Sequence, residues 1–364
     1  MDFRKLVGPS QLLLKFSRPA NFYLVIKKDF EHNGTFTAGN SKLLLNGTTK
    51  QTLKGLAALT LNNLEINKTS GDATAKTVEL GFGVTGVDLT VNGQTNILAG
   101  ILSFGSLGDT MRSSGNLTVG NGSGADDSAL SMLGGVTLQM GSGKILDVKT
   151  PDGILESAKS GLTPLITSNN PGVDFYYVKV SGKTKVNGLQ VTSLGSAGLF
   201  TDPAKNHGFT ILTTADIVSA GVSYFDELVF DDIQNSGTRD TYLRIFRNGS
   251  SPQLEMDFNK HIYDDGTADV NMDVNVYLNR GSTGSTIIQT MSSGNKGGSA
   301  GENYDMRDDS VNPGDDPDPG SIQWPVVKIW KGTVSNAWGV DGNWKLADGS
   351  GTTAPTGSDS VTIP

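Results

Sequence analysis

A recurring phrase of short apolar runs, separated by Asn-Gly or single-Gly turns, constrains the fold of this chain more than any other feature. The clearest copies fill residues 33–67, and related runs return at residues 88–93, 116–122 and 136–141. Leu89 and Leu117 are 28 residues apart, and Leu117 and Val136 are 19 residues apart. Recurrence at this spacing predicts a solenoid, in which similar rungs stack on one another instead of closing around one central core.

We expect this solenoid to be all-β, in the form of a right-handed parallel β-helix with rungs of roughly 20 to 28 residues. Leu, Val and Ile would form the inward stacks, Thr and Asn would point outward or stack in ladders, and Gly would turn the corners. Apolar periodicity of the helical kind is nearly absent from the sequence.

Changes in composition divide the chain into four segments. Residues 1–30 are predicted to form an N-terminal cap or edge strand. Residues 31–310 are the predicted β-solenoid, with clear repeats over 31–150 and decorated rungs over 151–310, where a β-sandwich-like part is the alternative. Residues 311–323 are an acidic linker rich in Pro and Gly. Residues 324–364 hold all the tryptophans and indicate the start of a further Trp-rich β module: Trp324, Trp330, Trp338 and Trp344.

Composition and charge exclude several classes of protein. The 364 residues carry a formal net charge of −8 and no basic cluster interleaved with aromatics, so we do not expect nucleic-acid binding. The chain has no cysteine, which excludes disulfides, thiolate metal sites and cysteine nucleophiles. No run approaches the ~18 apolar residues of a membrane span. No signal peptide is evident, and the chain ends within a strand-like run, so we expect a piece of a longer protein.

An acidic strand face near residue 270 is a candidate calcium site. Residues 269–278 alternate between apolar and polar side chains, which predicts a half-buried strand. Carboxylates spaced by two residues lie on one side of such a strand, where hard oxygen ligands suit Ca²⁺. The alternative is a solvated polar face. The candidate ligands are Asp264, Asp265, Asp269 and Asp273.

A second acidic group is a candidate catalytic site. A glycosidase or polysaccharide lyase needs paired carboxylates, or a base with a cation, on neighbouring rungs. Chance clustering of loop acids is the alternative, and we predict no catalytic residue. The three histidines, at positions 32, 207 and 261, have no metal-ligand spacing. The residues of the acidic group are Asp226, Glu227, Asp231, Asp232, Arg239, Asp240 and Arg244.

Two phrases resemble large secreted surface proteins of Bacteroidota. Residues 30–145 carry the Asn-Gly-Thr-Phe-Thr-Ala-Gly phrase with its Leu-rich sequel, and residues 326–364 carry a run that begins Ile-Trp-Lys-Gly and ends Asp-Ser-Val-Thr-Ile-Pro. The resemblance is to adhesins and gliding-motility proteins that leave the cell by the type IX secretion system. It implies β-helix and β-sandwich modules. This chain departs from a complete member because it lacks a signal peptide and a recognisable C-terminal sorting domain.

The same resemblance extends to O-glycosylation sites. Exported Bacteroidota proteins carry glycans on the second residue of Asp-Ser/Thr-apolar triplets, and this chain has four such triplets near predicted turns or linkers. The hydroxyl residues of these triplets are Thr110, Ser128, Ser310 and Ser360.

The sequence therefore predicts a non-enzymatic adhesin or stalk segment on the bacterial cell surface. Its expected partners are extracellular glycans or surfaces and the secretion or outer-membrane surface machinery. A carbohydrate-active β-helix enzyme and a structural filament or sheath subunit stay open as alternatives. The enzyme requires acids that converge on adjacent rungs, whereas the filament requires solenoid ends that assemble with further copies of the chain.

Overall fold

The computed structural model describes the chain in segments, most of them between residues 23 and 195. The ranges described are 23–33, 39–82, 88–104, 108–124, 127–195, 204–206, 208–212, 215–217, 226–231, 241–246, 262–264, 274–279, 307–308, 327–330, 337–346, 354–355 and 360–362.

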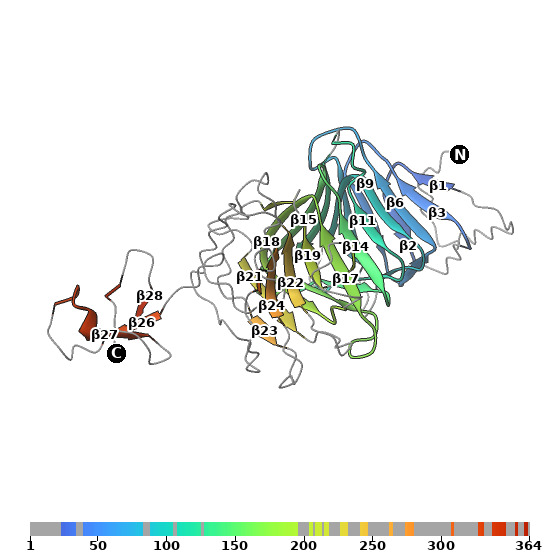
Figure 1. The fold of residues 1–364 in the computed structure, drawn as a ribbon. Helices are drawn as coiled ribbons and strands as arrows, with labels where there is room; N and C mark the ends of the chain where they lie inside the picture. The colour runs from blue at the N-terminus through green and yellow to red at the C-terminus, as the bar shows by residue number, and fades with distance from the viewer. Residues whose placement is uncertain are drawn as a thin grey trace.

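The described chain is all-β, and its main sheet is built from parallel strands (Figure 1). The strands form three ladders, in each of which every strand pairs with the next one. The first ladder contains β1 (Tyr23–Ile26), β3 (Lys42–Leu45), β6 (Asn63–Asn67), the first part of β9 (Thr95–Phe104), β11 (Leu117–Val119), β14 (Lys144–Val148), β17 (Tyr176–Val180), β19 (Phe209–Ile211), β22 (Thr241–Phe246), β24 (Val274–Asn279) and β25 (Arg307–Asp308).

The other two ladders alternate with the first along the chain. The second contains β2 (Phe30–His32), β4 (Gln51–Gly55), β7 (Thr77–Phe82), the end of β9, β12 (Ser128–Leu133), β15 (Gly153–Ala158), the start of β18 (Lys183–Thr192) and β20 (Asp216–Ile217). The third contains β5 (Leu59–Leu61), β8 (Leu89–Val91), β10 (Thr110–Ser113), β13 (Thr137–Met140), β16 (Leu165–Ser168), the end of β18, β21 (Asp226–Asp231) and β23 (Ile262–Asp264).

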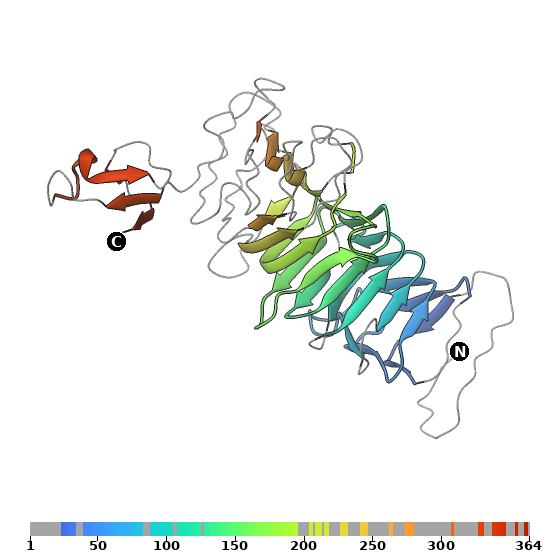
Figure 2. The same ribbon diagram turned by 90° about the horizontal axis from the view of Figure 1, so that it is seen from below.

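One visit to each ladder makes one turn of a β-helix-like stack, so the all-β parallel fold expected from the sequence is confirmed. The strands succeed one another along one axis in both views (Figures 1 and 2). The described strands between residues 151 and 310 pair in the same ladders as those before them.

The rungs are less regular than the sequence phrase predicts. In the first ladder, paired residues are 19 apart between Tyr23 and Lys42 and 34 apart between Phe209 and Leu243. The prediction that Leu89 and Leu117 are equivalent is wrong, because Leu89 pairs with Met111 in the third ladder while Leu117 belongs to the first. Copies of the phrase therefore fall on different ladders and do not mark equivalent positions on successive turns.

Stacked apolar side chains fill the interior. In strands such as β3, β4 and β6 every second residue is buried, as the two-residue period of a strand requires. The pairing register then aligns the buried residues of successive rungs. One such column of the first ladder is Leu45, Ile66, Ile97, Val119, Val148, Val180, Ile211 and Ile245.

Asn and Asp side chains link successive rungs at several corners. The Gln94 backbone N–H donates to Asn63 Oδ1 at 2.8 Å, and the Ile145 N–H donates to Asn116 Oδ1 at 3.1 Å. Glycine is required where corners stack most closely. A Cβ on Gly115 would lie 2.1 Å from the carbonyl oxygen of Gly93 on the preceding rung, a distance that no side chain tolerates.

The C-terminal part forms a separate three-stranded sheet in which β26 (Val327–Trp330) lies between β27 (Trp344–Leu346) and β28 (Ser360–Thr362). β26 pairs antiparallel with β27 and parallel with β28. A three-residue 3₁₀ turn, η1 (Asp341–Asn343), leads into β27. In the part of the chain that the structure describes, no helix is both long and apolar enough to cross a membrane.

Candidate functional site

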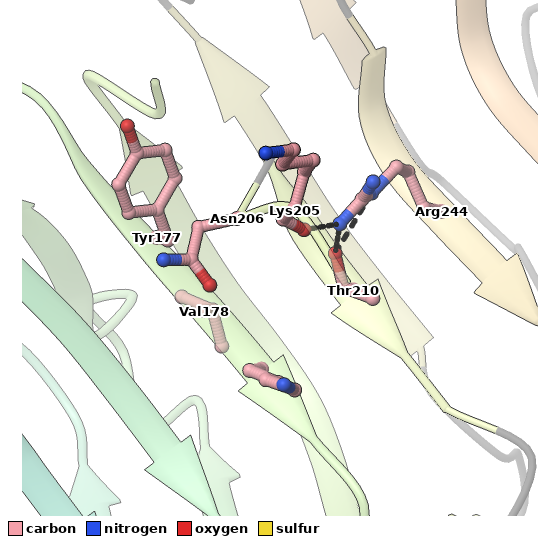
Figure 3. Close-up of a pocket in the computed structure, with 7 residues that line it drawn as sticks. Tyr177, Val178, Lys205, Asn206, Thr210 and Arg244 are labelled. Carbon is pink, nitrogen blue, oxygen red and sulfur yellow. Dashed lines mark hydrogen bonds between the residues drawn. The ribbon is translucent and has the colours of Figure 1, made fainter. Parts of the chain in front are cut away.

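A shallow depression lies on the outer side of the first ladder, close to β17, β19 and β22. Its space outside the protein atoms is about 190 Å³, open solvent included. The depression encloses no space that would admit even a water molecule, so it is a surface contact and not a small-molecule pocket. The lining residues are Tyr177, Val178, Lys179, Lys205, Asn206, Thr210 and Arg244 (Figure 3).

The pairing register explains why three of these residues meet. Lys179 pairs with Thr210, and Thr210 pairs with Arg244, so the three occupy one column on successive rungs. Their neighbours along the strands, such as Val178 and Val180, belong to the buried core. Because strand side chains alternate between the two faces, the column of Lys179, Thr210 and Arg244 faces outward.

Two members of this outward column are nevertheless buried. Thr210 is 2% exposed and Arg244 is 1% exposed. The segment 204–206, which precedes β19, contributes to this burial, since Arg244 Nη2 donates a 2.8 Å hydrogen bond to the Lys205 carbonyl oxygen. The outer surface here is therefore formed by this segment as well as by the strands.

Arg244 holds the floor of the depression in place. Its Nε and Nη2 donate to Thr210 Oγ1 at 2.9 and 2.7 Å (Figure 3). Its guanidinium also lies 5.2 Å from the centre of the Phe246 ring. A guanidinium has five donors in a fixed plane, so these contacts fix its orientation. Arg244 is a candidate catalytic cation by its sequence neighbours, whereas in the structure it binds the backbone that carries Lys205.

The lining carries positive charge and no carboxylate. Lys179 and Lys205 make no ion pair or hydrogen bond through their ammonium groups within the described residues, whereas Lys42 pairs with Glu65 at 2.6 Å across rungs. Burial raises the pKa of the Tyr177 phenol above its usual value of 10.0, so Tyr177 stays neutral at physiological pH. The arrangement can attract an anion and offer it hydrogen-bond donors.

The structure describes only some of the acidic residues that are candidates for catalysis. Asp226, Glu227 and Asp231 belong to β21, while Asp232, Arg239 and Asp240 lie outside the described residues. Asp231 pairs in register with Asp264 of β23, on the next rung. The sequence analysis did not join these two residues, because they are 33 positions apart and only the pairing reveals their proximity.

The predicted calcium ligands fall almost wholly outside the part described. Asp264 is the last residue of β23, and Asp265, Asp269 and Asp273 lie outside the described residues. Within the described ranges, no group of three or more His, Asp or Glu residues could hold a metal ion. His32 is buried in β2, and His207 and His261 lie outside the described residues.

Two of the four predicted glycosylation residues have described side chains, and they differ in exposure. Thr110 begins β10 and is partly exposed, and its Oγ1 donates to the Gly108 carbonyl at 3.3 Å. Ser128 begins β12 and is 0% exposed, so its hydroxyl is closed to modification in the folded chain. The side chain of Ser360, in β28, and the whole of Ser310 lie outside the description.

Three of the four tryptophans pack together in the C-terminal sheet. Trp330 stacks on Trp338 with ring centres 5.8 Å apart, and Trp344 meets Trp338 edge-on at 4.6 Å. Trp344 Nε1 donates to the Trp338 carbonyl at 2.8 Å. The packed-core interpretation of this set is thus confirmed for these three, although Trp338 keeps 49% of its surface exposed. Trp324 lies outside the described residues.

The sequence analysis missed a buried polar cluster near the N-terminal rungs. Lys68 is 1% exposed, and its ammonium donates to the Gly47 and Thr49 carbonyls at 2.6 and 2.8 Å and to Gln51 Oε1 at 2.9 Å. Gln51 Nε2 in turn donates to the carbonyls of Ile26 and Lys28 on the first rung. Burial lowers the pKa of Lys68 from its usual value. The cluster ties three rungs together and has a structural role.

Comparison of the chain with protein-family models, with curated proteins and with solved structures gave no match.

Proposed function

We propose that this chain is a segment of a non-enzymatic cell-surface adhesin or stalk, which presents a long β-helical surface for attachment or gliding. The observation that carries the proposal is the uninterrupted stacking of the first ladder, from β1 to β25. Its eleven strands give ten steps of about 4.8 Å, an extension of roughly 48 Å. A stack of this kind holds its outward columns at a fixed spacing over its whole length.

The finer features expected of the protein belong to the same proposal. The helix is right-handed, because parallel strand–crossover–strand connections are right-handed in nearly all proteins. The location is extracellular, the export route is type IX secretion, and the partners are extracellular glycans or surfaces. Support for these features comes from the resemblance of residues 30–145 and 326–364 to Bacteroidota surface proteins.

One observation favours a second candidate, a carbohydrate-active enzyme. Asp231 and Asp264 are register partners on adjacent rungs of the third ladder, which is the placement that paired catalytic carboxylates require on a β-helix. Fold analogy adds nothing to this candidate, since β-helices host many unrelated functions.

An attachment assay separates the two candidates. Beads coated with the full chain are applied to surfaces coated with neutral or acidic polysaccharides, and both bead retention and the release of sugar fragments are measured. The adhesin predicts retention without fragment release, and it predicts the same retention for Asp231→Asn. Fragment release that Asp231→Asn abolishes would establish the enzyme instead.

A further inference from the structure

We propose that the depression beside Arg244 binds the anionic group of an acidic polysaccharide, a carboxylate or a sulfate, with Lys179 and Lys205 as the charged contacts. This inference rests on the proposed function for the nature of the ligand, and on the geometry of the depression for the site.

The charge of the lining is opposite to that of the chain. The protein has 37 acidic and 29 basic residues, yet the lining contains three cations and no carboxylate. The nearest acid in the outward column is Asp147, one rung before Lys179, and no ion pair joins the two. Within the described residues Lys179 and Lys205 thus have no acidic partner, whereas Lys42, Lys50 and Lys54 are paired with acids on neighbouring rungs.

Different contacts position the backbones of the two lysines. Lys179 is fixed by the ladder, since β17 pairs with β14 on one side and β19 on the other. Lys205 is fixed through its backbone, because its carbonyl accepts the 2.8 Å hydrogen bond from the buried Arg244. The backbone of the site is thus ordered before a ligand binds, and the two lysine side chains are what lose conformational freedom on binding.

The chemistry of the lining favours an anion. Ammonium groups form charge-assisted hydrogen bonds with carboxylate and sulfate oxygens, and these bonds are about twice as strong as neutral ones. The Asn206 amide adds a neutral donor at the same place (Figure 3). Because the depression encloses no space of its own, the anionic group and the rest of the polymer would both lie on the surface.

The test compares two double variants of the full chain that change the net charge equally. The site variant is Lys179→Gln with Lys205→Gln. The control is Lys183→Gln with Lys185→Gln, on the second ladder, where both lysines face outward and are partly exposed. Binding to immobilised polygalacturonate, dextran sulfate and neutral dextran is measured at several salt concentrations, and circular dichroism checks that both variants are folded.

We expect the natural chain to bind at least one acidic polymer and not dextran. The site variant should bind at least about tenfold more weakly, and the control should stay within about twofold, because both lose the same long-range attraction. Preference for polygalacturonate or for dextran sulfate assigns the group as carboxylate or sulfate.

Three results would overturn the site: equal losses in the two variants, equal binding to neutral dextran, or no binding to either acidic polymer. None of them bears on surface location. Conversely, if the chain binds acidic polymers through these lysines but is absent from the cell surface, the proposed site stands and the adhesin proposal fails.

Discussion

Individual buried polar residues are distinctive features of this solenoid. Lys68 has an ammonium group among three oxygens, two of them backbone carbonyls. His32 and Asp88 are likewise buried. Burial lowers the pKa of His32 and raises the pKa of Asp88, so it favours the neutral form of each. Burying side chains of this type costs free energy, so replacing any one of them should measurably change the free energy of unfolding.

Replacement of Lys68 by methionine should destabilise the N-terminal rungs. The Lys68→Met change keeps the apolar stem but leaves the Gly47 and Thr49 carbonyls and Gln51 Oε1 without this donor. We expect the free energy of unfolding to fall by about 3 kcal/mol. Urea unfolding measures the loss. The exposed Lys28, changed to methionine, is the control and should alter stability by less than about 0.5 kcal/mol.

His32 predicts a pH dependence of stability. Burial lowers its pKa from the usual 6.5, and a hydrogen bond with the Ala58 backbone opposes this to a smaller extent. Between 6.5 and the lower folded value, the unfolded chain binds more protons than the folded chain. Stability should therefore be complete above pH 6.5 and decrease as the pH falls through the folded pKa. Melting temperatures from pH 7.5 to 5 should show this slope, and His32→Gln should reduce it; an unchanged slope would exclude His32 as its source.

The two glycosylation candidates with described side chains should behave differently. Thr110 is partly exposed and Ser128 is fully buried, although both follow an aspartate in the same triplet pattern. Peptide mass mapping of protein from its native host should find hexose-type additions on Thr110 and none on Ser128. A glycan on Ser128 would contradict its burial in β12.

At the scale of the element, the stacking distance limits which residues can turn a corner. Gly115→Ala would put a Cβ against the backbone of Gly93, so we expect a loss of about 2 to 3 kcal/mol. Gly81 is the matched control in β7, since its added Cβ would meet Thr52 Cγ2 at an ordinary 3.5 Å. Gly81→Ala should be neutral or stabilising by up to about 1 kcal/mol. Urea midpoints that place both variants together would contradict the stacking at this corner.

The strands themselves were largely predictable from the sequence. The alternation of buried and exposed residues in segments such as Asn63–Asn67 follows from the two-residue period and needs no knowledge of the fold. Their grouping into rungs was not predictable, because similar phrases occur on all three ladders. Leu89 and Leu117 carry the same local pattern and belong to different ladders.

The candidate site was even less predictable from the sequence than the grouping of strands into rungs. Lys179, Thr210 and Arg244 are separated by 31 and 34 residues, and only the register brings them into one column. An outward position would predict an exposed Arg244, but the segment around Lys205 covers it. Composition could indicate that the chain is acidic, yet it could not locate the column in which these cations meet.

At the scale of the whole molecule, a ladder of parallel strands provides reach. Each rung adds about 4.8 Å and repeats the same outward columns. Charge along the first ladder changes from the Lys42–Glu65 pair near the start to the cationic depression near Arg244. A long surface that carries a cationic contact is compatible with the attachment role proposed above.

The central claim, that this protein acts on the outside of the cell, is tested most directly by labelling intact cells of the native host. Antibodies raised against the purified chain are applied before and after lysis, with an abundant cytoplasmic protein as the control. We predict strong labelling of intact cells and its loss after brief treatment with an external protease. Labelling that appears only after lysis, in parallel with the cytoplasmic control, would contradict the account.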